Sequence, residues 1–122
     1  RLAWLRTEDL GDNHDMTFTL DGSRLVSAGQ RRMLAWDTAT WERSYDSGPS
    51  YPGSYGISLS PDGSLLAVAT DNRRLRIVDT GDLRTIRDLY MGVELIDVAF
   101  SPDGRKLAAS LTDGTVRIWQ VP

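Results

Sequence analysis

The stretch Ser101-Pro102-Asp103-Gly104 lies between two short apolar runs, Ile96–Phe100 before it and Lys106–Ser110 after it. The same four residues occur at Ser60-Pro61-Asp62-Gly63, and a degenerate copy is found at Thr19-Leu20-Asp21-Gly22. An Asp can hydrogen-bond the backbone two residues on and Gly accepts a positive φ, so each copy predicts a tight turn between two strands. The three glycines, at positions 22, 63 and 104, recur every 41 residues. This constant spacing indicates repeated structural units.

Alignment of the chain on these glycines also aligns the residues of the preceding strand. Three sets coincide: Met16, Ile57 and Val98; Phe18, Leu59 and Phe100; and Thr17, Ser58 and Ala99. Each strand therefore has one large and one small face, and both faces are expected to be buried between sheets that pack face to face. No helix-period pattern of useful length occurs, and the repeat length matches the roughly 40–45 residues of a four-stranded propeller blade. We predict an all-β β-propeller of four-stranded antiparallel blades, three per chain.

The repeat units are expected at approximately 1–40, 41–82 and 83–122. The last unit ends without a fourth strand. Residues 1–10 are predicted to form a short strand, which brings the total to three sets of four strands. Propellers close with about 4–8 blades, and an open arc would leave large apolar faces bare. We therefore expect the ring to be completed by oligomerisation, with residues 1–10 of one chain pairing with Val116–Val121 of another. A dimer, with six blades, is favoured over a trimer, with nine. The alternative to self-association is that the chain is a fragment of a longer propeller and meets its missing blades in another polypeptide.

Composition narrows the classes of function. The chain has 122 residues, of which 40% are hydrophobic and 25% charged, with a net charge of −3. This indicates a globular chain and argues against non-specific binding to nucleic acid or to an anionic membrane, which needs a basic surface. The absence of cysteine excludes disulfides and thiolate-ligated metals, and is in keeping with a reducing cytoplasm, the location we expect. No apolar run is long enough to span a membrane.

The repeated Ser-Pro-Asp-Gly, the run Leu65–Ala69 and the stretch Thr112–Trp119 resemble the WD-repeat propeller family. Trp36-Asp37 preserves the dipeptide from which the family takes its name. The Gly-His pair that usually opens such repeats is absent from all three units. The buried polar network that the resemblance would imply, made of a His, a Ser or Thr, a turn Asp and the Trp, is therefore incomplete. We expect these blades to depend more on apolar packing.

Motifs for catalysis are absent from the sequence. There is no Gly-x-Ser-x-Gly elbow, no phosphate-binding loop with its lysine, and a single histidine, His14. His14 lies beside Asp12 and Asp15, and we interpret it as a solvated loop residue rather than a metal ligand. The recurring Asp21, Asp62 and Asp103 are interpreted as turn formers. We therefore expect no catalytic, cofactor-binding or metal-binding residues and no cofactor.

The resemblance implies a non-enzymatic scaffold, a protein-protein interaction module whose rim of loops and hairpin tips binds a protein or peptide. The candidate contact residues are Arg32, Tyr51, Tyr55, Arg74 and Glu94. The two arginines belong to equivalent turns and could bind an acidic peptide. The net negative charge of the chain favours the simpler interpretation that they are solvated hairpin tips. The tyrosines suit protein recognition, or they pack over the blade edge.

Two alternatives stay open. One is an accessory or gating propeller of a hydrolase or other enzyme, such as a lyase or lactonase, for which Asp15 and Asp97 are well placed at the inner strand. The other is an engineered or excised set of blades that functions only in self-assembly.

Overall fold

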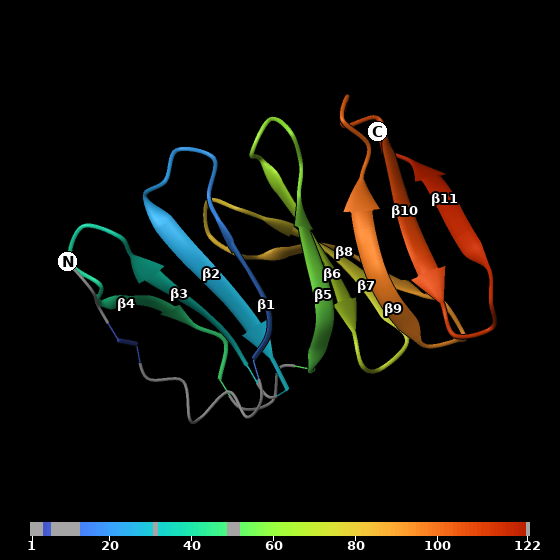
Figure 1. Cartoon of the computed structure of the whole chain (residues 1–122), viewed down its shortest axis with the longest axis horizontal. Coiled ribbons are helices and arrows are strands. Elements are labelled where there is room, and N and C mark those ends of the chain that lie inside the picture. The colour runs from blue at the N-terminus through green and yellow to red at the C-terminus, as the bar shows by residue number, and fades with distance from the viewer. Residues whose placement is uncertain (1–3, 6–12, 31, 49–51, 122) are drawn as a thin grey trace.

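The structure, a computed structural model, describes residues 4–5, 13–30, 32–48 and 52–121, and this part of the chain forms strands and no helix (Figure 1). Its strands form three antiparallel sheets, here called blades 1, 2 and 3. Blade 1 contains β1 (Asn13–Phe18), β2 (Arg24–Gly29), β3 (Met33–Asp37) and β4 (Arg43–Asp46). Blade 2 contains β5 (Ser54–Leu59), β6 (Leu65–Thr70), β7 (Arg74–Asp79) and β8 (Thr85–Tyr90). Blade 3 contains β9 (Leu95–Phe100), β10 (Lys106–Leu111) and β11 (Val116–Gln120).

In every blade the strands pair in chain order, so the predicted all-β fold of antiparallel blades is confirmed. Blades 1 and 2 have four strands and blade 3 has three, with β11 at its edge. The strand expected within residues 1–10 lies outside the described residues apart from Trp4 and Leu5, which belong to no strand. The described residues contain no helix long and apolar enough to cross a membrane. The unit boundaries at 1–40, 41–82 and 83–122, and closure of the ring by oligomerisation, stay predictions.

The recurring turn is held by its own side chains. In blade 2, Asp62 Oδ1 accepts hydrogen bonds from Ser60 Oγ (2.8 Å) and from the backbone N of Ser64 (3.0 Å). Ser60 Oγ also accepts one from Leu65 N (3.0 Å), which closes the hairpin. Gly63 has a φ of 79°, a conformation in which a Cβ would be strained. Asp21 and Asp103 accept equivalent bonds in the other two blades, which confirms the interpretation of these aspartates as turn formers.

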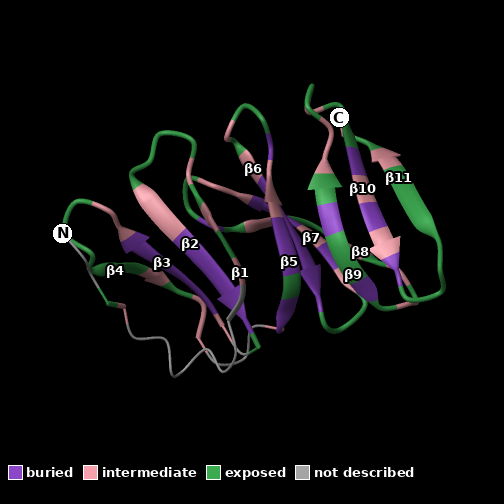
Figure 2. Cartoon of the chain, in the orientation of Figure 1, coloured by how far each residue is buried: buried purple, intermediate pink, exposed green. Residues whose placement is uncertain are grey.

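The blades pack with a large face of one against an alanine-rich face of its neighbour, as the alignment predicted. Blade 2 packs its large face on blade 1, and blade 3 packs its large face on blade 2. The large faces consist of Ile57, Leu66, Val68 and Val78 in blade 2 and Val98, Leu107 and Leu111 in blade 3. The receiving faces consist of Val26, Ala28, Met33 and Ala35 in blade 1 and Ala67, Ala69, Leu75 and Ile77 in blade 2. These two apolar interfaces form most of the core of the described chain (Figure 2). A smaller buried cluster, Leu34 and Trp36 with Leu5 and Leu25 packed against it, lies on the other face of blade 1.

At the two ends of the array large apolar residues are exposed, as expected of three blades that do not close into a ring. Met16 and Phe18, on the large face of blade 1, are 55% and 56% exposed. Val116 and Ile118, on the outer face of blade 3, are 63% and 66% exposed, and Figure 2 shows β11 mostly in green. In the described structure no further blade lies against either face, so these four residues meet solvent. Leu34 and Trp36, which share the face of Met16 and Phe18, are nevertheless buried, and Leu5 packs against them. We call these surfaces the blade 1 flank and the blade 3 flank.

Candidate functional site

The residues predicted to bind a partner lie at one end of the blades. Arg32 immediately precedes β3 and Arg74 begins β7, while Tyr55 lies early in β5 and Glu94 immediately precedes β9. The β2–β3 and β6–β7 hairpins and the β4–β5 and β8–β9 connections meet at this end, which we call the connector rim (Figure 1). The structure thus brings four of the five candidates to one rim. The fifth, Tyr51, lies outside the described residues.

The two candidate arginines of the connector rim, Arg32 and Arg74, are paired with carboxylates of β4 and β8, the fourth strands of their blades. Arg32 Nη1 donates to Asp46 Oδ2 at 2.8 Å and to Oδ1 at 3.0 Å. Arg74 Nη1 lies 3.7 Å from Asp88 Oδ1, and its guanidinium lies over the ring of Tyr90, 5.3 Å from the centroid. The two candidate arginines of a basic ring for an acidic peptide therefore already have partners, whereas the neighbouring Arg73, in the β6–β7 hairpin of the same rim, is exposed. Whether these residues bind a protein or peptide stays a prediction.

Exposed side chains accompany these pairs. Tyr55, Tyr90 and Glu94 are all exposed on the connector rim, and aromatic side chains beside an arginine are the composition favoured at protein interfaces. Tyr90 was not recognised from the sequence as a candidate. Its place depends on the β7–β8 register, in which Arg74 pairs with Tyr90 and one irregularity lies between Ile77 and Val78. The same irregularity occurs at the equivalent place in blade 1, between Ala35 and Trp36.

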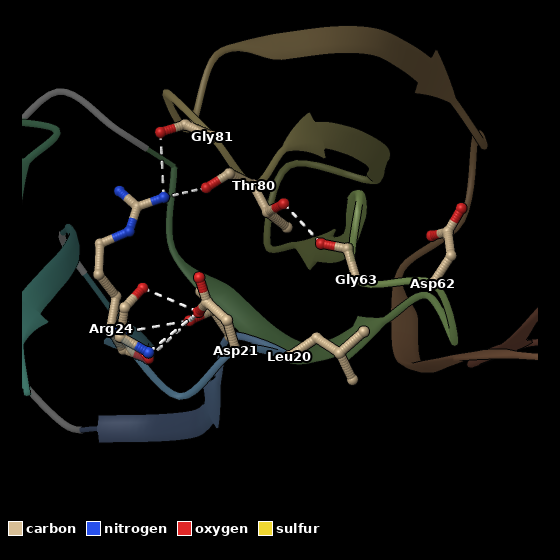
Figure 3. Close-up of a pocket in the computed structure, with 9 residues that line it drawn as sticks. Leu20, Asp21, Arg24, Asp62, Gly63, Thr80 and Gly81 are labelled. Atoms are coloured by element: carbon tan, nitrogen blue, oxygen red, sulfur yellow. Dashed lines mark hydrogen bonds between the residues drawn. The ribbon is translucent and has the colours of Figure 1, made fainter.

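A pocket of about 460 Å³ lies at the opposite end of the blades, between the β1–β2 turn of blade 1 and the turns of blade 2 (Figure 3). Arg24 crosses it, and its Nη2 donates to the backbone carbonyls of Thr80 and, at 3.0 Å, of Gly81. Leu20 lies against Gly63 on the other side of the pocket. These contacts join blade 1 to blade 2. The sequence did not indicate this joint, because Arg24 and Thr80 are far apart in the chain.

The acidic groups of this pocket are engaged in turns. Hydrogen bonds from the backbone and side chain of Ser23 and from the Thr19 hydroxyl lower the pKa of Asp21 to about 2. The equivalent bonds from Ser64 and Ser60 lower the pKa of Asp62. Both carboxylates are therefore ionised and hold their own hairpins at neutral pH, and the guanidinium of Arg24 is used by backbone carbonyls. The two carboxylates thus hold turns and Arg24 joins the blades, and none of these three groups is left to act as an acid or base.

The two aspartates considered for the enzymatic alternative lie in β1 and β9, the first strands of blades 1 and 3. Asp15 Oδ2 accepts a hydrogen bond from the backbone N of Ile57 (3.1 Å), so Asp15 joins blade 1 to blade 2. Asp97 Oδ1 accepts one from the N–H of the following residue, Val98 (2.9 Å), and Asp97 is exposed. Within the described ranges, no group of three or more His, Cys, Asp or Glu side chains could hold a metal ion. The side chain of His14 lies outside the described part of the structure.

Comparison with known proteins gives consistent matches. The family model described as WD domain, G-beta repeat, matches residues 48–79 and 92–120. An uncharacterized WD repeat-containing protein of Synechocystis is 32% identical over 115 residues, covering 86% of this chain and 31% of that protein. Echinoderm microtubule-associated protein-like 2 of Rattus norvegicus is 34% identical over 106 residues, covering 81% of this chain and 15% of that protein. The chain thus spans less than a third of the length of either relative.

Proposed function

We propose that this chain, which belongs to the WD-repeat family, is a non-enzymatic scaffold that joins with copies of itself into a closed propeller and binds a protein or peptide. WD-repeat proteins are generally protein-interaction scaffolds. The observation that carries the proposal is the exposure of Met16 and Phe18 at one end of the array and of Val116 and Ile118 at the other. Repeat units of this kind bury such faces only against neighbouring units.

Closure by two chains would give six blades, within the usual range of about 4–8, whereas three chains would give nine. The edge strand β11 has an unpaired outer side in the described structure, and we propose that residues 1–10 of a second chain supply the missing strand there. A reducing cytoplasm is the proposed location, in keeping with a chain that has no cysteine.

The partner-binding surface that we propose is the connector rim. Tyr55 and Glu94 are exposed there, and Arg74 is held over Tyr90, which limits the conformational entropy the arginine would lose on binding. Large aromatic side chains and arginines supply most of the binding energy in protein interfaces. Arg32 lies at the same end, fixed by its two bonds to Asp46.

Native mass spectrometry tests the assembly half of the proposal. The expected species has twice the mass of the 13.6 kDa chain, and a monomer at every concentration examined would contradict self-assembly.

Selection of peptides from a displayed library tests the binding half. Enriched peptides should lose binding to the Arg74→Glu variant and keep it to Arg105→Glu, a matched charge reversal of an exposed arginine in the β9–β10 turn, away from the connector rim. Peptides that discriminate in the opposite sense would place the binding surface elsewhere.

A further inference from the structure

Arg73 is an arginine in a backbone conformation that favours glycine. Its φ is 66°, and the residue at the equivalent place in blade 3 is Gly114, with a φ of 85°. It lies in the β6–β7 hairpin and is exposed. The hairpin is closed by the buried hydroxyl of Thr70, which accepts the N–H of Arg74 at 3.2 Å. Residues held at a positive φ gather at ligand-binding and other functional sites, so Arg73 is a candidate ligand contact.

The backbone of Arg73 is fixed from both sides. Asp71 N, in the same hairpin, donates to Gly53 O of the β4–β5 connection at 2.8 Å. Met91 N, directly after β8, donates to Arg73 O, also at 2.8 Å. Blade 2 lies between blades 1 and 3, so this part of the connector rim is not at an end of the array. The guanidinium is therefore carried on a rigid support whose surroundings are complete.

The positive charge of Arg73 has no counter-charge in place. Within the described ranges its guanidinium makes no hydrogen bond and no salt bridge. The carboxylate of Asp88 is already shared between Arg74, at 3.7 Å, and Arg76, at 3.5 Å. The carboxylate of Asp71 lies against the backbone of the β4–β5 connection. Arg73 is thus available to an anionic group of a ligand.

Two exposed tyrosines flank Arg73 across the rim of blade 2. Tyr55 lies near the start of β5, two residues after the β4–β5 contact of the hairpin, and Tyr90 ends β8, directly before Met91. The sheet order β5-β6-β7-β8 places the hairpin between these two strands. The guanidinium of Arg74 lies over the ring of Tyr90. An aromatic, a cationic and a second aromatic side chain thus follow one another, and we call Tyr55, Arg73 and Tyr90 the rim row.

The spacing of the rim row suits an extended peptide. Neighbouring strands lie about 4.8 Å apart, so β5 and β8 are each roughly 7 Å from the middle of the β6–β7 hairpin. Two residues of an extended chain also span about 7 Å, and side chains two residues apart point to the same side. A peptide laid across the rim from β5 to β8 would therefore meet the rim row with its first, third and fifth side chains.

We propose that the rim row binds an extended acidic peptide that has Asp or Glu at its centre and an apolar residue two positions to either side. The central carboxylate pairs with the guanidinium of Arg73, which can donate to both of its oxygens. The two apolar side chains pack on Tyr55 and Tyr90, whose rings supply large contact areas. This inference rests on the proposed binding at the connector rim and names the chemistry of the peptide.

Fluorescence anisotropy with a labelled synthetic peptide tests the inference on the full chain. The probe has the core Phe-Ser-Glu-Ser-Phe between Gly-Ser linkers. Arg73→Gly should weaken its binding about tenfold, because a charge-assisted hydrogen bond is lost. This variant relieves the backbone strain, since Gly114 has the equivalent place in blade 3, so the hairpin should be kept. Arg105→Gly removes an exposed arginine of the β9–β10 turn and should leave the affinity unchanged.

Two control probes test the charge and the spacing. One has Gln in place of Glu, and the other has the core Phe-Glu-Ser-Ser-Phe, in which the carboxylate points to the opposite side of an extended chain. Both should bind the wild-type chain about tenfold more weakly than the first probe, and Arg73→Gly should not weaken them further.

The outcomes separate this inference from the proposed function. Equal binding of the Glu and Gln probes, or unchanged binding by Arg73→Gly, refutes the role of Arg73. Equal binding of the probe with the displaced Glu refutes the spacing. A Glu probe that does not bind, while library peptides bind in a manner that Arg74→Glu abolishes, refutes this inference and leaves the proposed function standing. Library peptides that Arg74→Glu does not affect refute the connector rim as the binding surface.

Discussion

The glycines of the three recurring turns offer a graded test of how the blades touch one another. Gly22, Gly63 and Gly104 have nearly the same φ, at 74°, 79° and 73°, so an alanine would meet nearly the same backbone strain at each. Their surroundings differ. A Cβ added at Gly22 would meet no atom within 4 Å, and at Gly104 it would meet Pro61 Cδ at an ordinary 3.4 Å. At Gly63 it would lie 2.6 Å from Leu20 Cβ, in the neighbouring blade.

These contacts set the expected loss of stability. The left-handed conformation costs an alanine about 1–2 kcal/mol, of which about 0.4–1 kcal/mol is offset by the lower entropy of the unfolded chain. Gly22→Ala and Gly104→Ala should therefore destabilise the protein by about 1 kcal/mol. Gly63→Ala adds overpacking of about 1–3 kcal/mol, because Leu20 Cβ is attached to the backbone and cannot rotate away. We expect a total of about 2–4 kcal/mol for Gly63→Ala.

Urea unfolding followed by tryptophan fluorescence measures these differences, at one protein concentration because association would itself stabilise the fold. Double variants locate the cause. Leu20→Gly removes the offending carbon and should reduce the cost of Gly63→Ala to that of Gly22→Ala, whereas Leu20→Ala keeps the carbon and should not. Equal losses at all three glycines, or an equal rescue by Leu20→Ala, would refute the close approach of the two blades at Gly63.

Three further predictions concern hydrogen bonds of the blades. Arg24→Ala leaves the carbonyl of Thr80 without its cationic donor and should lower the free energy of unfolding by about 1–2 kcal/mol, as measured by urea denaturation. Ser58→Ala removes the acceptor of Phe100 N and should cost about 1 kcal/mol, and a neutral result would show that the inter-blade bond is not needed. Because folding lowers the pKa of Asp21 to about 2, from an unfolded value near 4, its stabilising effect is present above about pH 4. The urea midpoint should therefore fall between pH 4 and pH 2, and Asp21→Ala should lessen that fall.

The turns and the faces of the strands could be predicted from the sequence because their causes are local. Ser60, Asp62 and Gly63 close a hairpin through bonds to residues no more than five positions away, so the motif itself carries the information. The alternation of large and small residues assigns the large and the small face of each strand, and this assignment does not depend on the neighbouring sheet. The same reasoning placed four of the candidate partner-binding residues on one rim.

Other features of the structure depend on contacts between residues far apart in the sequence, which the repeat pattern does not indicate. The contact of Arg74 with Tyr90 joins two strands of blade 2, and the bond from Arg24 to Thr80 crosses between two blades. Neither pair is near in sequence, and neither recurs in all three units, so the alignment of the repeats could not indicate it.

The sequence alone determined that the chain forms β-blades with a large and a small face, since a 41-residue repeat and alternating side chains are properties of the residues themselves. Only the tertiary structure decided which of those faces are covered. Ile57 is buried and Met16 at the matching position is exposed, although both are large apolar residues on equivalent strands. The physical reason is that burial depends on the presence of a neighbouring sheet, and a residue's own chemistry does not specify whether that neighbour is there.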